Sequence, residues 1–134
     1  MANIIGFLNE QQQPIILCKI LHNGESYSFN AIFDTGANKS CIGEHIIAQI
    51  GIASIGTQLQ GNTDNVISVN THIVTIKLAQ DIVFPDIEVI SSNLPGIDAL
   101  IGMDIISQGD FHIYHLTDGR ITFSFDVPPY YSVP

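Results

Sequence analysis

Short runs of apolar residues rich in Ile, Val and Phe recur along the chain and are separated by turn-forming residues. Such runs are typical of β-strands, and only two segments carry apolar residues at helical spacing. Residues 26–33 alternate apolar and polar side chains, which predicts a strand with one buried face. The Asn-Gly pair at residues 23–24 favours a tight hairpin turn to a partner strand at residues 14–21. We therefore predict a mostly-β protein.

The remaining pattern predicts a second hairpin, two short helices and further strands. Residues 43–51 place three isoleucines on one helical face and end on a glycine, and residues 103–109 form another helix of one to two turns. Residues 56–78 predict two strands around a polar tip, "GNTDN", which would form a projecting hairpin. Other strands are predicted at residues 82–84, 86–90, 99–102, 110–115 and 120–125.

Length and charge restrict the classes of function. The 134 residues suffice for one domain, which we expect at residues 14–125, between an N-terminal segment (residues 1–13) and a proline-rich C-terminal tail (residues 126–134). Four Lys plus Arg against thirteen Asp plus Glu give a net charge of −9, which argues against nucleic-acid and anionic-membrane partners. The N-terminus lacks the pattern of a signal peptide, so we expect a cytoplasmic protein.

The cysteines and histidines give no signal for a metal or a cofactor. Cys18 and Cys41 lack C-x-x-C spacing and are interpreted as reduced thiols, although one disulfide stays possible. His112 and His115 are three residues apart in a predicted strand, so they would lie on opposite faces. No Cys or paired carboxylate stands at ligand spacing from the other histidines, which are His22, His45 and His72.

The segment "AIFDTGANKS", residues 31–40, ends an apolar strand on Asp34. Aspartate is disfavoured in strands, and a buried carboxylate needs hydrogen bonds or a retained proton. Asp34 is therefore a candidate functional acid. The alternative is an Asx turn that ends the strand, which the residues alone favour because Asp-Thr-Gly often forms one.

Two motifs together resemble those of the retropepsin-like aspartic proteases, the single-domain, homodimeric proteases of retroviruses and of cellular and bacterial relatives. One is an apolar strand that ends in Asp-Thr-Gly-Ala, here "IFDTGA", and the other is "LIGMDII", an apolar-apolar-Gly sequence followed by a short helix. Their order and spacing agree over residues 14–125. The resemblance implies a closed-barrel-like, mostly-β fold with a flap hairpin, and the activity of an aspartic endopeptidase without a cofactor.

The resemblance also implies site residues. The catalytic group would be Asp34, with Thr35 locking the loops of two subunits together and Gly36 allowing the backbones to approach. Rigid support beneath Asp34 would come from Leu100, Ile101 and Gly102. Substrate-binding residues would be Ala37, Asn38, Gly61, Asn62, Thr63, Asp64, Asn65 and Val66. Apolar specificity pockets are expected from Ile42, Val66, Ile67 and Leu100.

A single Asp-Thr-Gly makes a second copy of the chain necessary for catalysis. Peptide hydrolysis by carboxyl groups needs a base that activates water and an acid that protonates the departing groups, so two aspartates must meet across the twofold axis of a homodimer. Aspartic proteases are the familiar example of two carboxyls that share one proton. The substrate would be an extended peptide covered by the flap, whose tip here is stiffer than the glycine-rich tips of the family.

Two other functions stay open. The chain could be a catalytically silent module of the same fold that binds peptides, or a scaffold whose function is dimerisation and in which Asp34 only ends a turn. Asp98 and Asp104 flank "LIG", but Asp104 suits the first turn of a helix, where a carboxylate meets the helix dipole. The C-terminal tail could be a disordered end, a dimer-contact arm or a self-cleavage segment.

Overall fold

The computed structural model describes residues 2–61, 64–79 and 82–128. Within these residues, strands dominate and the helices are short, as predicted. The strands are β1 (Ala2–Phe7), β2 (Ile15–His22), β3 (Glu25–Phe33), β4 (Cys41–Gly43), β5 (Gly56–Gly61), β6 (Val66–Lys77), β7 (Val83–Ser92), β8 (Ala99–Ile101), β9 (Asp110–His115) and β10 (Ile121–Val127). The helices are α1 (Glu44–Ile50) and α2 (Met103–Ile106). Neither has the length that crossing a bilayer requires.

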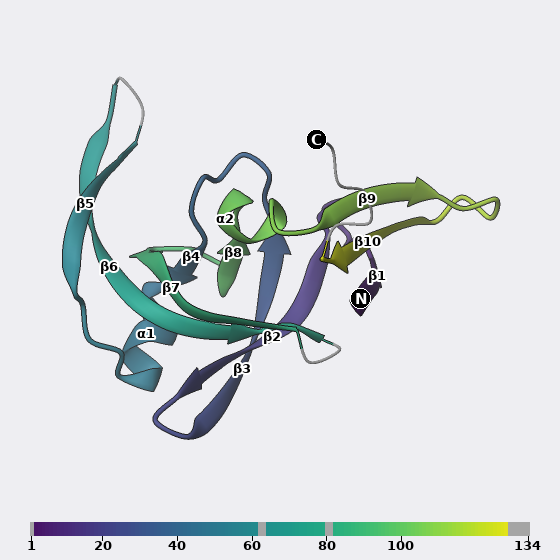
Figure 1. The fold of residues 1–134 in the computed structure, drawn as a ribbon. Helices are drawn as coiled ribbons and strands as arrows, with labels where there is room; N and C mark the ends of the chain where they lie inside the picture. Colours follow the sequence, from purple (N-terminus) through teal and green to yellow (C-terminus); the bar gives the residue numbers. More distant parts are fainter. Residues whose placement is uncertain (1, 62–63, 80–81, 129–134) are drawn as a thin grey trace, which may run out of the picture.

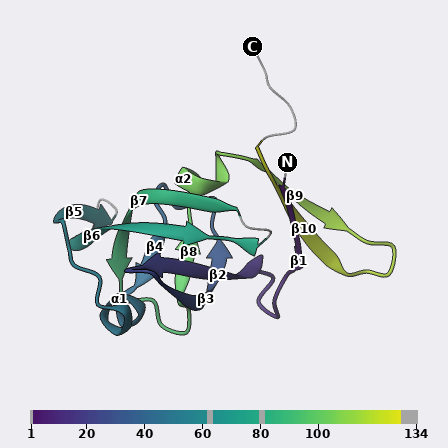
Figure 2. The ribbon, with the colours of Figure 1, turned by 60° about the horizontal axis from the view of Figure 1, so that its bottom comes forward.

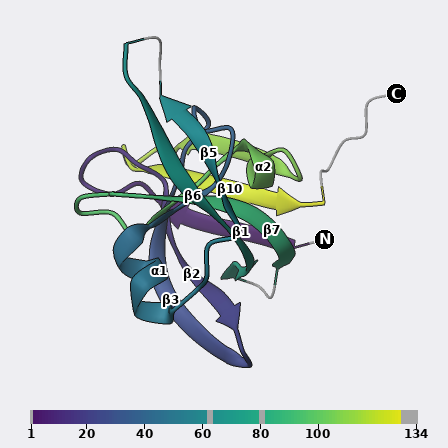
Figure 3. The same cartoon turned by 90° about the vertical axis from the view of Figure 1, so that its left-hand side faces the viewer.

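A closed barrel forms the body of the molecule. The strand order is β2-β3-β8-β4-β7-β6-β5, and an additional pairing of β2 with β6 closes six of these strands into a ring. Within the described chain β5 pairs with β6 alone, and the β5–β6 hairpin projects beyond the barrel (Figure 1). Figure 3 shows this hairpin extending upward, with α1 below it. The prediction of a mostly-β, barrel-like fold with a projecting hairpin is confirmed.

The hairpin of β2 and β3 forms as the Asn-Gly signal predicts. Asn23 has φ 51° and Gly24 has φ 77°, and positive φ at both central residues is what a type I′ turn requires. The pairing runs from Ile15 opposite Ile32 to His22 opposite Glu25. The turn thus fixes the register of β2 against β3, and Asp34 directly follows the last residue of β3.

A second, three-stranded sheet joins the two ends of the chain. Its order is β1-β10-β9, and β1 pairs with β10 from Ala2 opposite Val127 to Phe7 opposite Thr122. Residues 2–7, which the sequence pattern leaves as part of an N-terminal segment, are therefore a strand of this sheet. Figure 2 shows the sheet beside one end of the barrel.

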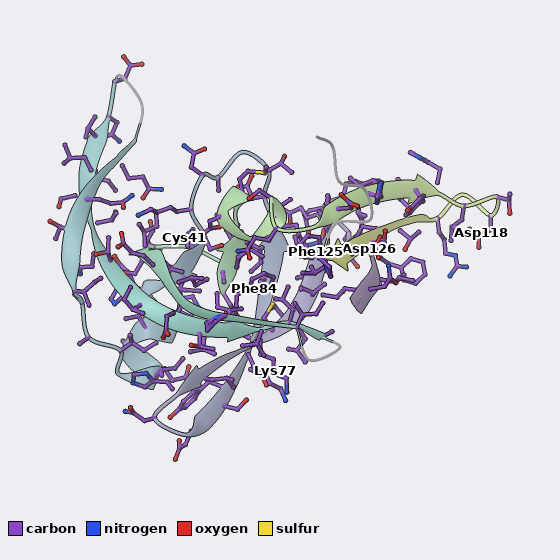
Figure 4. The ribbon with its side chains drawn as sticks, viewed as in Figure 1. Cys41, Lys77, Phe84, Asp118, Phe125 and Asp126 are labelled. Carbon is purple, nitrogen blue, oxygen red and sulfur yellow. The ribbon has the colours of Figure 1, made fainter. Side chains whose placement is uncertain are left out.

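Aromatic rings connect this sheet to the barrel. The ring of Phe33, the last residue of β3, lies 5.0 Å from that of Phe111 and 5.5 Å from those of Phe123 and Phe125. Phe123 and Phe125 are fully buried. Figure 4 places Phe125 at the base of the β9–β10 hairpin and Asp118 at its far end. The strand that precedes Asp34 is thus anchored in the core by ring packing.

One strand boundary differs from the prediction. Residues 82–84 and 86–90 were predicted as separate strands, but β7 continues through Pro85 to Ser92. Pro85 and Asp86 together lie opposite one residue of β6, Thr75, because the register shifts between Val74 and Ile76. This β-bulge absorbs the proline, which has no N–H to donate to the ladder.

Asp98 connects three parts of the barrel that are distant in sequence. Its Oδ2 accepts the backbone N–H of Asn30 in β3 at 3.0 Å, and its Oδ1 lies 3.1 Å from Nε2 of His45 in α1. The hydrogen bond from Asn30, followed by that from His45, lowers the pKa of the Asp98 carboxyl. The ionised carboxylate therefore stabilises the fold.

We predict that Phe123→Ala lowers the free energy of unfolding by about 3–5 kcal/mol, because it opens a cavity in the aromatic core. Urea unfolding followed by circular dichroism measures this loss. The control is Leu17→Ala, since the Leu17 side chain is 60% exposed. Equal effects of the two substitutions would contradict the assigned core.

We predict that Asp98→Asn destabilises the protein at neutral pH and that its effect shrinks under acid. A carboxyl whose pKa is lower in the folded state stabilises it above the unfolded-state pKa of about 3.9 and loses this effect as the pH falls through the folded value. Urea unfolding between pH 7 and pH 3 measures the difference from the parent protein. Glu10→Gln, a substitution of an exposed carboxylate, is the control. An effect of Asp98→Asn that stays constant down to pH 3 would refute the assignment.

Candidate active site

Asp34 begins a loop, residues 34–40, that leaves the end of β3. Its backbone N–H donates to the carbonyl of Ile101 at 2.8 Å, and its carbonyl accepts the N–H of Ala37 at 3.2 Å. Its Oδ1 accepts the backbone N–H of Gly36 at 2.9 Å. This is the geometry of an Asx turn, and it holds the half-buried carboxyl group at a fixed place on the loop.

The loop rests on the junction between β8 and α2. Met103 N–H donates to the carbonyl of Ala37 at 2.7 Å, and Asp104 N–H donates to that of Asn38 at 3.2 Å. At Gly102, a Cβ atom would lie 2.7 Å from the carbonyl carbon of Lys39 and 2.8 Å from the carbonyl oxygen of Ala37. Only glycine therefore allows this approach of the two backbones.

A buried serine and Asp104 make a second connection between the loop and α2. Ser40, which is fully buried, donates its N–H to Oδ2 of Asp104 at 2.9 Å and its hydroxyl to Oδ1 at 2.8 Å. The Ser40 Oγ in turn accepts the N–H of Gly102 at 3.0 Å. Asp104 lies in the first turn of α2, as expected, and it also fixes the loop. A local sequence pattern could not reveal this second role, because Ser40 and Asp104 are 64 residues apart.

The residues predicted to act with Asp34 lie close to it in the fold. Thr35 and Gly36 are exposed on the loop. The parallel pairing of β3 with β8 places Leu100 opposite Ile32 and Ile101 opposite Phe33. Leu100 is half-buried, whereas Ile101 and Gly102 are buried.

The predicted hairpin residues fall into two groups. Gly61 and Val66 pair at the ends of β5 and β6, and Gly61 has φ 139°, where an added Cβ would collide with the carbonyl oxygen of Asn65. Asp64 and Asn65 are exposed near the tip, whereas Asn62 and Thr63 lie outside the described residues.

Strand alternation separates the two faces of the β5–β6 hairpin. Ile67 lies opposite Gln60, and Val66 lies opposite Gly61. Residues directly opposite each other in an antiparallel pair share a face, so Ile67 is on the face of Gln58 and Gln60, while Val66 is on the other. Lys39 in the loop contacts Gln58, which identifies the first face as the one toward the loop.

A cleft of about 470 Å³ lies between the loop and β5. It is lined by residues 36–39, residues 58–61 and Ile90, which include the predicted Ala37, Asn38 and Gly61. The expected apolar pocket differs, because Ile42 is fully buried in the core and so cannot line an open pocket. Sequence reasoning missed the polar lining residues Lys39, Gln58 and Gln60. The only signal in the sequence is that Lys39 closely follows Asp34 and that Gln58 and Gln60 closely precede the hairpin tip.

The remaining candidate residues have structural environments. Burial raises the pKa of Cys18 to about 12 and that of Cys41 to about 11, so both free thiols are protonated and unreactive. His72 is buried, with its ring nitrogens 3.0 Å from the Ala53 carbonyl and 2.8 Å from Ser91 Oγ. In the described ranges, no three His, Cys, Asp or Glu residues are grouped to hold a metal ion.

We predict that Gly102→Ala destabilises the protein by about 1–3 kcal/mol, because the new methyl group forces the loop away from β8 and α2. The midpoint and slope of urea unfolding give this value. Gly56→Ala is the matched control, since a Cβ there would meet its nearest neighbour at an ordinary 3.4 Å. If Gly102→Ala proved as stable as the control, the loop would not depend on this contact.

Comparison with known proteins supports one assignment of the family and the fold. The family model described as "gag-polyprotein putative aspartyl protease" matches residues 19–108, which is more than half of the chain. None of the curated proteins matches the chain in sequence.

Many solved structures are similar, among them those of three proteases. The retropepsin-like aspartic protease from Rickettsia conorii has a TM-score of 0.63 and 13% identity over 94% of this chain and 93% of its own. The EIAV protease complexed with the inhibitor HBY-793 has a TM-score of 0.60 and 17% identity over 76% of this chain and 92% of its own. The Simian Foamy Virus (mac) protease has a TM-score of 0.51 and 19% identity over 69% of this chain and 91% of its own.

At these identities the structural likeness concerns the fold, and the family match covers both "IFDTGA" and "LIGMDII". The chain belongs to the gag-polyprotein aspartyl protease family, a family of retropepsin-like aspartic proteases.

Proposed function

We propose that this chain is an aspartic endopeptidase whose active site combines two Asp34 carboxyl groups, one from each subunit of a homodimer. The observation that carries the proposal is the position of Asp34 on a loop that hydrogen bonds hold to the β8–α2 junction, beside the cleft under β5. A rigid mounting of this kind is what a catalytic group requires, because small displacements cost large factors in rate.

The homodimer follows from the chemistry together with the sequence. The chain contains a single Asp-Thr-Gly, and one carboxyl group cannot be both the base and the acid of a peptide hydrolysis. Two copies related by a twofold axis bring two identical carboxyls together. The exposed Thr35 would contact the partner loop through its hydroxyl, and Gly36 would allow the close approach.

The substrate in this proposal is an extended peptide. The outer edge of β5 has no strand partner in the described chain, so its backbone N–H and C=O groups can pair with a peptide as an added strand. The β5–β6 hairpin would act as a flap that covers the peptide and excludes water from the two carboxyls. Ala37, Asn38 and Gly61 line the cleft in which the peptide would lie.

Hydrolysis would use the one proton that the two carboxyls share. The ionised Asp34 takes a proton from the attacking water, whose oxygen bonds to the carbonyl carbon, while the protonated Asp34 of the other subunit donates its proton to the carbonyl oxygen. The resulting gem-diol collapses as the C–N bond breaks: the carboxyl that now holds the water proton gives it to the departing nitrogen, and one gem-diol hydroxyl gives its proton to the other carboxylate, so the pair again shares one proton. The support from Leu100, Ile101 and Gly102 keeps each carboxyl in place during these transfers.

We predict that Asp34→Asn lowers the turnover of an unfolded protein substrate at mildly acidic pH by at least about 10²–10⁴-fold, since it removes acid–base catalysis. Light scattering of the variant should give the same dimer mass as the parent. Asp86→Asn, in which an exposed carboxylate outside the cleft is replaced, should keep full activity. Cleavage by the Asp34→Asn dimer at the parent rate would refute the proposed mechanism, and the chain would then be a binding or scaffold module.

Mixed dimers test whether both carboxyls are needed. When equal amounts of parent and Asp34→Asn chains are unfolded and refolded together, random pairing leaves about a quarter of the dimers with two aspartates, so activity should fall to about a quarter of that of the parent. A chain that worked alone would retain half of the activity. Activity that scales linearly with the parent fraction would therefore exclude the shared site.

A further inference from the structure

The cleft under β5 has polar side chains on both walls, beside the apolar Leu59 and Ile90. The loop contributes Asn38 and Lys39, and β5 contributes Gln58 and Gln60, which alternation places on the loop-facing side of the hairpin. Of the apolar residues expected to form specificity pockets, Ile42 is fully buried and Val66 belongs to the other hairpin face, whereas Ile67 shares the loop-facing side with Gln60. The side chain that a substrate places here therefore meets amides and a charge.

Lys39 supplies that charge. Its Nζ donates to Oε1 of Gln58 at 2.9 Å and to Oε1 of Glu88 in β7 at 2.7 Å. An ammonium group carries three N–H donors, and these two contacts use two of them. The side chain is 37% exposed, so the third donor can be reached from the cleft. The other basic residues, Lys19, Lys77 and Arg120, do not line this cleft.

We propose that Lys39 determines specificity in a polar subsite that accepts an acidic side chain of the peptide substrate. The inference rests on the proposed function and adds the chemistry of one subsite to it. A substrate carboxylate receives a charge-assisted hydrogen bond from the third N–H of Lys39, and the Gln60 amide can donate a second. A substrate lysine or arginine meets the like charge of Lys39, and an apolar side chain covers the ammonium without a hydrogen bond.

Glu88 has a defined part in this subsite, because it competes for the same ammonium group. While Glu88 is ionised, the attraction of Lys39 for a substrate carboxylate is partly cancelled. Replacing Glu88 by glutamine leaves a hydrogen-bond acceptor for Lys39 but removes the competing charge. Preference for acidic substrates should therefore rise with Glu88→Gln and fall with Lys39→Gln.

The opposite effects of Glu88→Gln and Lys39→Gln on the preference for acidic substrates distinguish a recognition role of Lys39 from a structural one. If Lys39 only tethered the loop to β5 and β7, both substitutions would weaken this tether at the contact between Lys39 and Glu88. They would then change the cleavage of all substrates in the same direction, and the preference for acidic over neutral peptides would not move. The ratio of kcat/KM for an acidic peptide to that for its neutral counterpart therefore changes if Lys39 recognises the substrate, and stays constant if Lys39 only tethers the loop.

The experiment compares matched peptides that carry Glu, Gln, Leu or Lys at each position around one cleavage site, identified by mass spectrometry. At pH 5.5 the substrate glutamate is ionised, since its pKa is about 4.3. We expect kcat/KM for one position to be about tenfold higher with Glu than with Gln, and this preference to disappear in Lys39→Gln. It should increase in Glu88→Gln, and Lys39→Glu should prefer Lys instead.

The control is Lys19→Gln, which removes the same charge from an exposed position on β2 and should leave the preference unchanged. Equal cleavage of the Glu and Gln peptides at every position, or a preference that survives Lys39→Gln, would overturn the subsite. Fluorescence anisotropy measures the binding of the same peptides to the Asp34→Asn variant, and so distinguishes a failure of the subsite from a failure of the proposed protease activity. A protein that binds the Glu peptide more tightly through Lys39 but cleaves nothing would keep the subsite and reject the protease.

Discussion

The close contact between the loop after β3 and the β8–α2 junction is the constraint on which the site depends. Gly102 approaches the backbone of residues 37–39 to a distance that excludes any side chain, and the buried Ser40 connects the same two segments through partly buried hydrogen bonds to Asp104. Buried polar groups of this kind are costly unless fully paired, so the network favours one arrangement strongly over others. Asp34 takes its position from that arrangement.

The aromatic core connects the loop that carries Asp34 to the three-stranded sheet. Phe33 immediately precedes Asp34, and its ring packs against Phe111 and Phe125 of the sheet that joins the chain ends. The β1–β10 pairing and the carboxyl loop are thereby connected by direct packing. A change in the terminal sheet can thus reach Asp34 through one side chain, because close-packed interiors transmit small displacements.

The cleft gives the family fold a local chemistry of its own. Retropepsin-like architecture provides an open strand edge at β5 and a loop below it, and in this chain amide side chains and the ammonium group of Lys39 line the space between them beside Leu59 and Ile90. An ion pair that is partly exposed contributes little to stability, so drawing the Lys39 ammonium group partly away from Glu88 costs little folding free energy. The proposed preference for an acidic substrate side chain depends on that availability.

The sequence alone determined the elements whose signals are local. The Asn23-Gly24 turn set the first hairpin, the alternation of residues 26–33 set a half-buried strand, and "IFDTGA" with "LIGMDII" indicated the family. Only the tertiary structure decided which distant side chains meet. The contact of Ser40 with Asp104 and that of Lys39 with Gln58 depend on packing between separate segments, and periodicity within one segment carries no information about it. The bulge at Pro85 depends on the register between β6 and β7, which the pattern of either strand alone does not fix.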